Sequence, residues 1–270
     1  MTTTTPFQQM CSGSMIQGIS INGTALHTSG RIEQIWEEVL GSPQLYGLPV
    51  HLPLRPGALD IPQIVGPREF GVGIIPYGAN DKDQAGHNDQ WRTLARLVWS
   101  PKTPLTVTRT VRFTAGDETH ECSAKFLGGL SPTMIVPGSM SRLSLRFLNL
   151  DGYWFALADV IDTISGGGGT FTITGDATTR RVSLTFSGGT GVQTLTNTTN
   201  GVAVAYNGDT TGTDVDLDVF GFTADQGGSN VVGNVTHSGD EFWMAVDPGD
   251  NVFTLTGGGS VTIQAREAYL

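Results

Sequence analysis

The last thirty residues, 241–270, carry the pattern that most constrains the fold. Phe242, Met244 and Val246 alternate with two other apolar residues, as side chains do on the two faces of a strand. The next residues, 247–250, place Pro in the first central position of a turn and Gly directly after it, as a type II turn requires. Two more alternating runs follow at 252–256 and 261–265. Together these segments predict a β-meander that closes a sheet.

The region before this meander repeats the same pattern. Short alternating runs at 171–173, 181–186, 192–195, 201–206 and 214–219 are separated by Gly, Asn and Asp. Such spacing is typical of a β-sandwich. In the run 214–219 the apolar residues are expected to face the core and the alternating aspartates the solvent: Val215, Leu217 and Val219 against Asp214, Asp216 and Asp218.

Composition favours strands and turns over helices, because the chain has 37 Gly and only 15% charged residues. Two cysteines, Cys11 and Cys122, are too few for a disulfide framework, and neither has a second Cys or His at zinc-ligand spacing. No signal peptide is visible, and no segment approaches the roughly 18 apolar residues of a membrane span. We therefore expect a soluble protein that folds in a reducing cytosol, without a metal, a cofactor or a membrane partner.

Charge divides the chain into two parts. Residues 1–150 hold 12 Lys and Arg against 11 Asp and Glu, whereas residues 151–270 hold 3 against 14. A step of this size predicts two domains. The charge step and the run of four glycines at 166–169 place the break between Phe147 and Gly169.

The first half is predicted to be α+β. Residues 88–99 have capping residues at their start, apolar residues three and four apart, and Pro101 just past their end, which indicates an amphipathic helix. Residues 105–113, 122–127 and 143–148 alternate as strands. The segment 31–40 is ambiguous, because its apolar residues have helical spacing while the resemblance described next favours a strand.

Several segments resemble the distal tail proteins (Dit) of long-tailed bacteriophages, the siphophages. The end of the chain does so through the turn Pro248-Gly249-Asp250-Asn251 and the terminal 266–270, Arg-Glu-Ala-Tyr-Leu. The first half does so through Ile21-Asn22-Gly23, the turn at 55–57, the strand near 72–76, the single helix, and the strand 142–149 running into 151–155. The match departs from the family pattern in the Pro-rich segment 42–66, where the ring-forming hairpins cannot be placed.

The resemblance implies a mainly β fold in two parts: a belt-type β domain with one helix at residues 1–150, and a galectin-like β-sandwich at residues 151–270. It also implies a structural virion protein of the phage tail tip, assembled in the host cytoplasm. Six belt domains would close into a hexameric ring that connects the tail tube to the tip or baseplate hub and leaves a channel for DNA. The implied partners are the chain itself, the tail tube protein, the hub or tail-associated protein and receptor-binding proteins.

No motif in the sequence predicts an enzyme. The neighbours His120, Glu121 and Cys122 would alternate between the two faces of a strand and so could not hold one metal together. The other histidines have no nucleophile partner in a recognisable motif and are expected at the surface: His27, His51, His87 and His237. The tetraglycine lacks the Lys and helix of a phosphate loop and is expected to be a flexible connector. The aligned aspartates lack the curved loop of an EF-hand, which favours a solvated strand face over a calcium site.

Two alternatives to the structural role remain open. A β-sandwich could bind carbohydrate as a receptor-recognition module if exposed rings stacked on sugars, and the candidate rings are Trp154, Tyr206, Trp243 and Phe220. A cell-wall hydrolase is weaker, because no paired acid and base can be identified. Arg109 and Arg112 are the predicted subunit contacts, since residues three apart on a strand cannot both be buried on one face. No sequence-specific binding of nucleic acid is expected from a chain of net charge −10.

Overall fold

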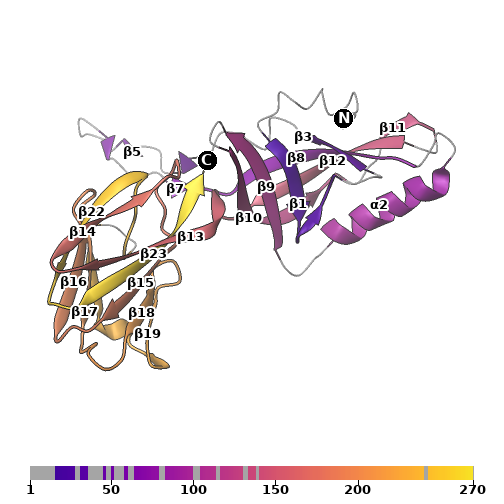
Figure 1. Cartoon of the computed structure of the whole chain (residues 1–270). Helices are drawn as coiled ribbons and strands as arrows, with labels where there is room; N and C mark the ends of the chain where they lie inside the picture. Colours follow the sequence, from indigo (N-terminus) through magenta and orange to yellow (C-terminus); the bar gives the residue numbers. More distant parts are fainter. Residues whose placement is uncertain are drawn as a thin grey trace. The chain divides into compact units, whose positions relative to one another are not determined.

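The computed structural model describes residues 16–27, 31–35, 45–46, 50–51, 58–59, 64–78, 83–99, 104–113, 116–129, 133–137, 140–239 and 243–269 (Figure 1). Tertiary contacts divide the chain into two compact units. The first runs to Trp154 and the second covers Phe155–Tyr269. We describe each unit by itself.

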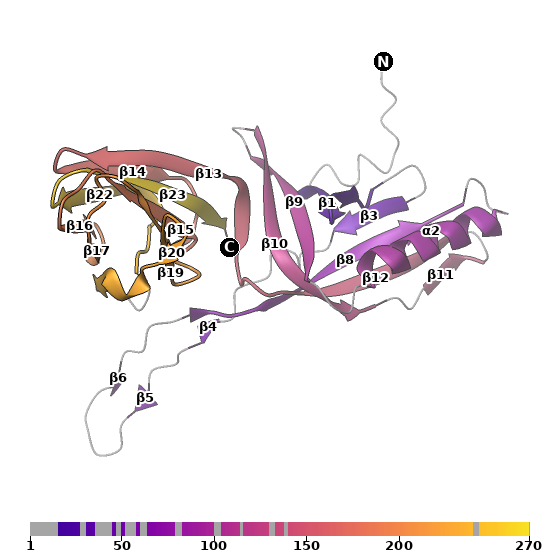
Figure 2. The same cartoon turned by 90° about the horizontal axis from the view of Figure 1, so that it is seen from below.

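The first unit is built on one antiparallel sheet. Its strand order is β2 (Thr24–Ala25), β1 (Ile16–Ile21), β9 (Leu105–Phe113), β10 (Gly116–Gly128), β12 (Met140–Asn149), β8 (Arg68–Pro76) and β3 (Arg31–Ile35). The strand β11 (Thr133–Val136) pairs with the start of β12. Two nested ladders form a separate hairpin within the segment 42–66, joining β4 (Leu45–Tyr46) to β7 (Ile64–Val65) and β5 (Val50–His51) to β6 (Ala58–Leu59) (Figure 2).

Alternation along these strands produces the core of the first unit. Leu143, Leu145 and Phe147 of β12 are fully buried, while the residues between them are partly or wholly exposed. Phe147 stacks on Phe70 of β8, with ring centroids 5.3 Å apart. Phe70 in turn contacts the ring of Trp154 at 5.3 Å. The aromatic side chains therefore fix the register between β8 and β12 and hold the end of the unit against its sheet.

Helix α2 (Gln84–Val98) lies along β8 and β12 (Figures 1 and 2). Its N-cap is Asp83, whose Oδ1 accepts a hydrogen bond from the backbone N–H of Gly86 at 2.8 Å. Leu94 and Val98, four residues apart, are completely buried. The helix predicted at 88–99 is thus confirmed, but it begins four residues earlier because the cap residue is Asp83.

The second unit is a sandwich of two antiparallel sheets. One contains β14 (Gly168–Ile173), β22 (Gly249–Thr256), β16 (Val192–Asn197), β17 (Val202–Asn207) and β21 (Val235–Ser238). The other contains β13 (Trp154–Ser165), β23 (Ser260–Tyr269), β15 (Val182–Ser187), β18 (Val215–Asp218), β19 (Thr223–Gln226) and β20 (Ser229–Asn230), with a 3₁₀ turn at Val232–Asn234. The inner faces meet in one core that includes Phe171, Phe186, Phe253 and Ile263.

The predicted mainly β class, α+β in the first half, is confirmed. The strands at 105–113, 122–127 and 143–148 are confirmed, and the ambiguous segment is a strand over Arg31–Ile35, with 36–40 outside the described residues. Val215, Leu217 and Val219 are buried and the alternating aspartates exposed, as expected.

The predicted strand before the last turn is wrong. The described part, 243–247, makes a single bridge, between Thr179 and Val246. Trp243, Met244 and Ala245 are all buried, but within the described residues they pair with no strand. Phe242 lies outside the described residues. After the turn, where Gly249 has a φ of +91°, β22 and β23 follow as predicted.

The tetraglycine is also not a connector between domains. Gly166 and Gly167 have φ values of +63° and +99° and form the turn between β13 and β14 within the sandwich, where Ser165 pairs with Gly168.

Candidate assembly surfaces and the buried Arg109 cluster

Arg109 lies on the inner face of β9 and is only 3% exposed. Its guanidinium carbon lies 4.6 Å from the centroid of the Trp154 ring, in cation–π geometry. Its Nε donates a hydrogen bond to Nδ1 of His120, 3.4 Å away on the neighbouring strand. These contacts of Arg109 lie within one subunit. A further contact with a neighbouring subunit stays a prediction.

His120 links Arg109 to a carboxylate. Because Nδ1 accepts from Arg109, the proton of a neutral ring lies on Nε2, which is 3.4 Å from Oε2 of Glu118. His120 is 1% exposed and the Glu118 carboxylate is partly exposed, so the chain of contacts runs from the core to the surface. Arg112 pairs through its backbone with Asp117, and its side chain lies outside the described residues.

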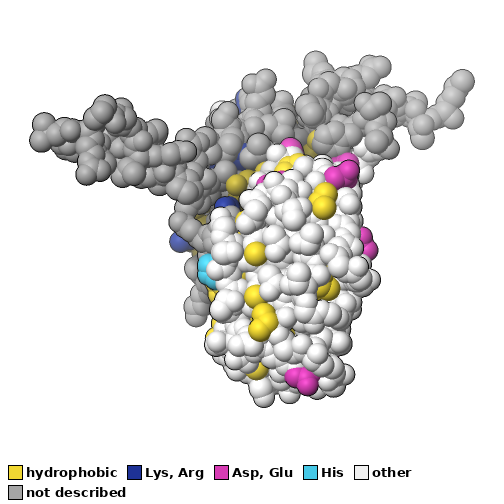
Figure 3. All heavy atoms as spheres, turned by 90° about the vertical axis from the view of Figure 1, so that its left-hand side faces the viewer, with side chains coloured by type: hydrophobic (Ala, Val, Ile, Leu, Met, Phe, Trp, Pro, Cys, Tyr) yellow, Lys and Arg dark blue, Asp and Glu magenta, His cyan; other side chains and the backbone are white. Residues whose placement is uncertain are grey.

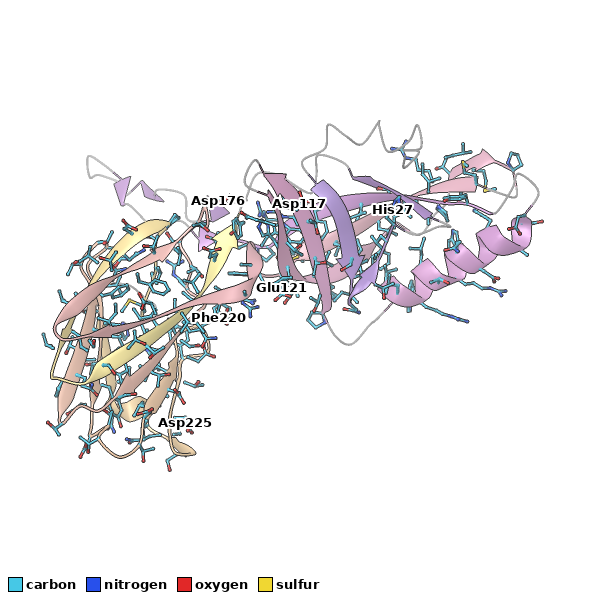
Figure 4. The ribbon with its side chains drawn as sticks, viewed as in Figure 1. His27, Asp117, Glu121, Asp176, Phe220 and Asp225 are labelled. Atoms are coloured by element: carbon cyan, nitrogen blue, oxygen red, sulfur yellow. The ribbon has the colours of Figure 1, made fainter. Side chains whose placement is uncertain are left out.

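Cys122 shares the inner face with His120, whereas Glu121 points to the other face (Figure 4). This alternation is the one expected from sequence. Burial raises the pKa of the Cys122 thiol well above its usual range, and the nearby Asp151 raises it further. A thiol held neutral in this way is a poor nucleophile and a poor metal ligand.

The prediction that His87 lies at the surface is wrong. His87 is 6% exposed, and its Nε2 lies 2.9 Å from Oγ of Ser141 on β12. The imidazole therefore ties α2 to the sheet. His27 and His237 are exposed, as predicted, and the side chain of His51 lies outside the described residues.

The outer face of β1, β9 and β10 is a hydroxyl surface. Ser20 and Thr108 are joined by a 2.6 Å hydrogen bond between their side-chain oxygens, and Thr110 and Thr119 by one of 3.1 Å. Asp117 and Glu121 lie on the same face of β10 (Figure 4). The face is thus polar, and it carries Lys125 of β10 as well as the two carboxylates.

Apolar side chains are exposed elsewhere on the first unit. Met134 and Ile135 of β11 are 47% and 49% exposed, although neighbouring residues in a strand point to opposite faces. Trp99, the C-cap of α2, is 70% exposed. Sequence reasoning missed these residues. Only the short apolar run 134–136 between Pro132 and Pro137 could have indicated Met134 and Ile135, because the type of a residue does not determine whether its side chain is exposed.

The sugar-stacking candidates are mostly core residues. Trp154 and Tyr206 are 1% exposed and Trp243 is 7% exposed, so the expectation that they could be exposed is wrong for these three. Aromatic side chains bury a large apolar area, which favours a place in the core. Phe220 is 54% exposed at the tip of the β18–β19 hairpin, with the Arg181 guanidinium 5.5 Å from its ring (Figure 4).

The outer face of the second sheet of the sandwich is acidic. Asp216 and Asp225 are directly opposed on β18 and β19, next to Asp218. Asp159 on β13 is 2.9 Å from Nε of Arg266 on β23. Burial alone would raise the pKa of Asp159, but hydrogen bonds from Arg266 and Gln264 outweigh it and lower this pKa.

The described residues contain neither a candidate metal site nor a membrane-spanning helix. No group of three or more His, Cys, Asp and Glu side chains in this part of the chain is arranged to hold a metal ion. No helix there is long and apolar enough to cross a membrane.

No protein-family model matches the chain, and no curated protein is detectably similar in sequence. Similarity is found instead among solved structures. The crystal structure of the SPP1 Dit protein, described as a paradigm of the hub adsorption apparatus in phages that infect Gram-positive bacteria, aligns with a TM-score of 0.70. The alignment has 13% identity and covers 94% of this chain and 99% of SPP1 Dit.

Two structures of the phage p2 baseplate in its activated conformation, with Sr and with Ca, align at 9% identity over 93% of this chain and 97% of theirs. Their TM-scores of 0.38 and 0.37 are too low to establish a shared fold. The resemblance to distal tail proteins is therefore confirmed at the level of the fold, through SPP1 Dit.

Proposed function

We propose that this chain is a distal tail protein, a structural subunit at the tip of a bacteriophage tail. The observation that carries the proposal is the length of the structural match: both units align with SPP1 Dit over 94% of this chain and 99% of that one. A match over one sandwich alone would mean little, because β-sandwiches host many functions. An ordered pair of a belt-like sheet that carries helix α2 and a sandwich is much more specific.

The proposed assembly is a hexameric ring built by the first unit. A ring closes through heterologous contacts, in which one patch on a subunit meets a different patch on the next. Exposed Met134 and Ile135 on β11, and Trp99 at the end of α2, are suited to such patches because large exposed apolar side chains mark interfaces. The near-neutral charge of residues 1–150 adds little repulsion between subunits.

The ring would connect the tail tube to the tip or baseplate hub and leave a channel for DNA. The hydroxyl face of β1, β9 and β10 suits a channel wall, since its described side chains are mainly hydroxyls and carboxylates, which do not bind phosphates, with Lys125 as a cation among them. The proposed partners are the chain itself, the tail tube protein, a hub or tail-associated protein and receptor-binding proteins. The proposal includes no catalytic step and no sequence-specific binding of nucleic acid.

The test is electron microscopy of tails with a tag inserted in the exposed Gly227-Gly228 turn, located by a tag-specific antibody. We expect label only at the distal end of the tail and six-fold symmetry in averages of that level. Label along the tube, or on the head, would contradict the tail-tip role. Label at the tip with three-fold symmetry would support the tail-tip location but contradict the proposed hexameric ring.

A further inference from the structure

The two outer faces of the sandwich differ sharply in charge. Residues 151–270 carry 14 acidic residues against 3 basic ones, and Asp216, Asp218 and Asp225 lie together on the outer face of the β15–β18–β19 sheet. The outer face of the other sheet, β14–β22–β16–β17–β21, is made mainly of Thr, Ala, Val and Ser. Among its described strand residues Asp250 is the one carboxylate, and its Oδ1 accepts a hydrogen bond from Thr172 at 2.6 Å.

Strand register makes this neutral face continuous. Thr254 lies opposite Thr196, which lies opposite Ala203, which lies opposite Ser238, in one row across four strands. Val252 and Val192 are 48% and 51% exposed on the same face. Figure 3 views the molecule from the side where β16, β17 and β22 lie in Figure 1, and the surface there is mostly white with scattered yellow, with a few magenta acidic side chains toward its edges. We call this surface the threonine face.

We propose that the threonine face packs against the same face of a second copy of this chain. Every copy carries the same strong negative charge, so a contact between acidic faces would place carboxylates together in a poorly solvated layer. The threonine face is where two copies can meet with least repulsion. A cationic partner would be drawn to the acidic face instead. A sugar is disfavoured, because the described strand residues of this face include no aromatic ring.

The area of the face sets the strength of the contact. Five strands spaced about 4.8 Å apart and about six residues long at roughly 3.4 Å each give about 500 Å² per copy. Two such faces bury about 1,000 Å² in all, below the standard interface and within the weak, transient class. A single pair of copies should therefore associate weakly, and several pairs held together should associate much more strongly.

The inference does not depend on ring formation, since the contact doubles whatever species exists. Sedimentation velocity of the full chain, from about 1 µM to about 1 mM, should show the mass doubling toward the upper end, whether from monomer to dimer or from hexamer to dodecamer. Added salt should move the doubling to lower concentration, because it screens repulsion between like-charged copies.

Thr254→Glu is the decisive variant, because a two-fold symmetric contact places one new carboxylate from each copy in the interface. We expect it to weaken the doubling at least about tenfold. Ser187→Glu is the matched control, since it adds the same charge on the outer face of the other sheet, opposite Ser260, and should leave the doubling unchanged. Circular dichroism verifies that each variant is folded, and Thr196→Glu replaces Thr254→Glu if needed.

Absence of doubling in the native chain over this range overturns the proposal. Equal weakening by both substitutions also overturns it, because net charge and not the threonine face would then control association. A native chain that doubles but dissociates on adding salt contradicts the argument from like charge.

Discussion

Replacing Arg109 tests whether its buried geometry or its predicted subunit contact matters more. Arg109→Ala removes the Cγ and Cδ methylenes of the stem, worth about 0.8 kcal/mol each when buried. It also removes a desolvated cation–π contact with Trp154, worth about 2 kcal/mol, and the hydrogen bond to His120, worth about 1 kcal/mol. The variant no longer buries a charge, which offsets about 2 kcal/mol. The expected net loss is therefore about 3 kcal/mol in the stability of the first unit.

The assay is urea unfolding of the full chain, read by tryptophan fluorescence. For a unit of this size, with a slope of about 2 kcal/mol per M, a loss of about 3 kcal/mol lowers the midpoint of its transition by about 1.5 M. The transition of the sandwich should not move. Arg109→Lys is the control, because it keeps a cation over the Trp154 ring and loses only the planar donor, so about 1 kcal/mol is expected.

The opposite result would refute this reasoning. If Arg109→Ala left the unfolding midpoint within about 0.3 M of the native value but prevented higher-order assembly, the side chain would act between subunits and its burial in one subunit would be incidental.

Three further outcomes are expected. Asn251→Leu should destabilise the sandwich by about 3 to 4 kcal/mol, because the buried amide makes four hydrogen bonds, to the backbone of Asp247 and Gly249 and to Asn197. Chemical denaturation measures this loss. As a control, Val252→Ala at the neighbouring, 48% exposed position should change the stability by less than about 0.5 kcal/mol. Asp159→Asn should lower the stability of the sandwich by about 1 kcal/mol at pH 7 and leave it unchanged near pH 2. A carboxyl with a lowered pKa stabilises the fold above its unfolded pKa of about 3.9, and it loses that contribution as the pH falls through its folded pKa. An equal loss of stability at both pH values would show that charge is not the cause. Limited proteolysis should leave a stable fragment that starts near Phe155 and ends near Tyr269, identified by mass spectrometry, and degradation without such a fragment would contradict the prediction of two domains.

Much of the fold could be predicted because local periodicity and burial agree along most strands. Leu143, Leu145 and Phe147 alternate with polar residues in sequence, and they alternate in burial as well. Residues 243–246 broke this rule, since a run of apolar residues can fill a core without forming a strand. The Gly166–Gly167 turn was misjudged for a related reason: glycines mark a change of direction but do not say whether it lies within a domain or between two.

The candidate surfaces could be predicted only in part. The sequence alone determined the mainly β class, the helix at residues 88–99, the acidic second half and the alternation that separates Asp216 from Leu217, because these depend on neighbours along the chain. Tertiary structure decided which side chains are buried. Arg109 packs against the ring of Trp154, Trp154 is buried in the core, and Met134 is exposed. Burial depends on which distant strands pair, and that pairing is not a property of any short segment.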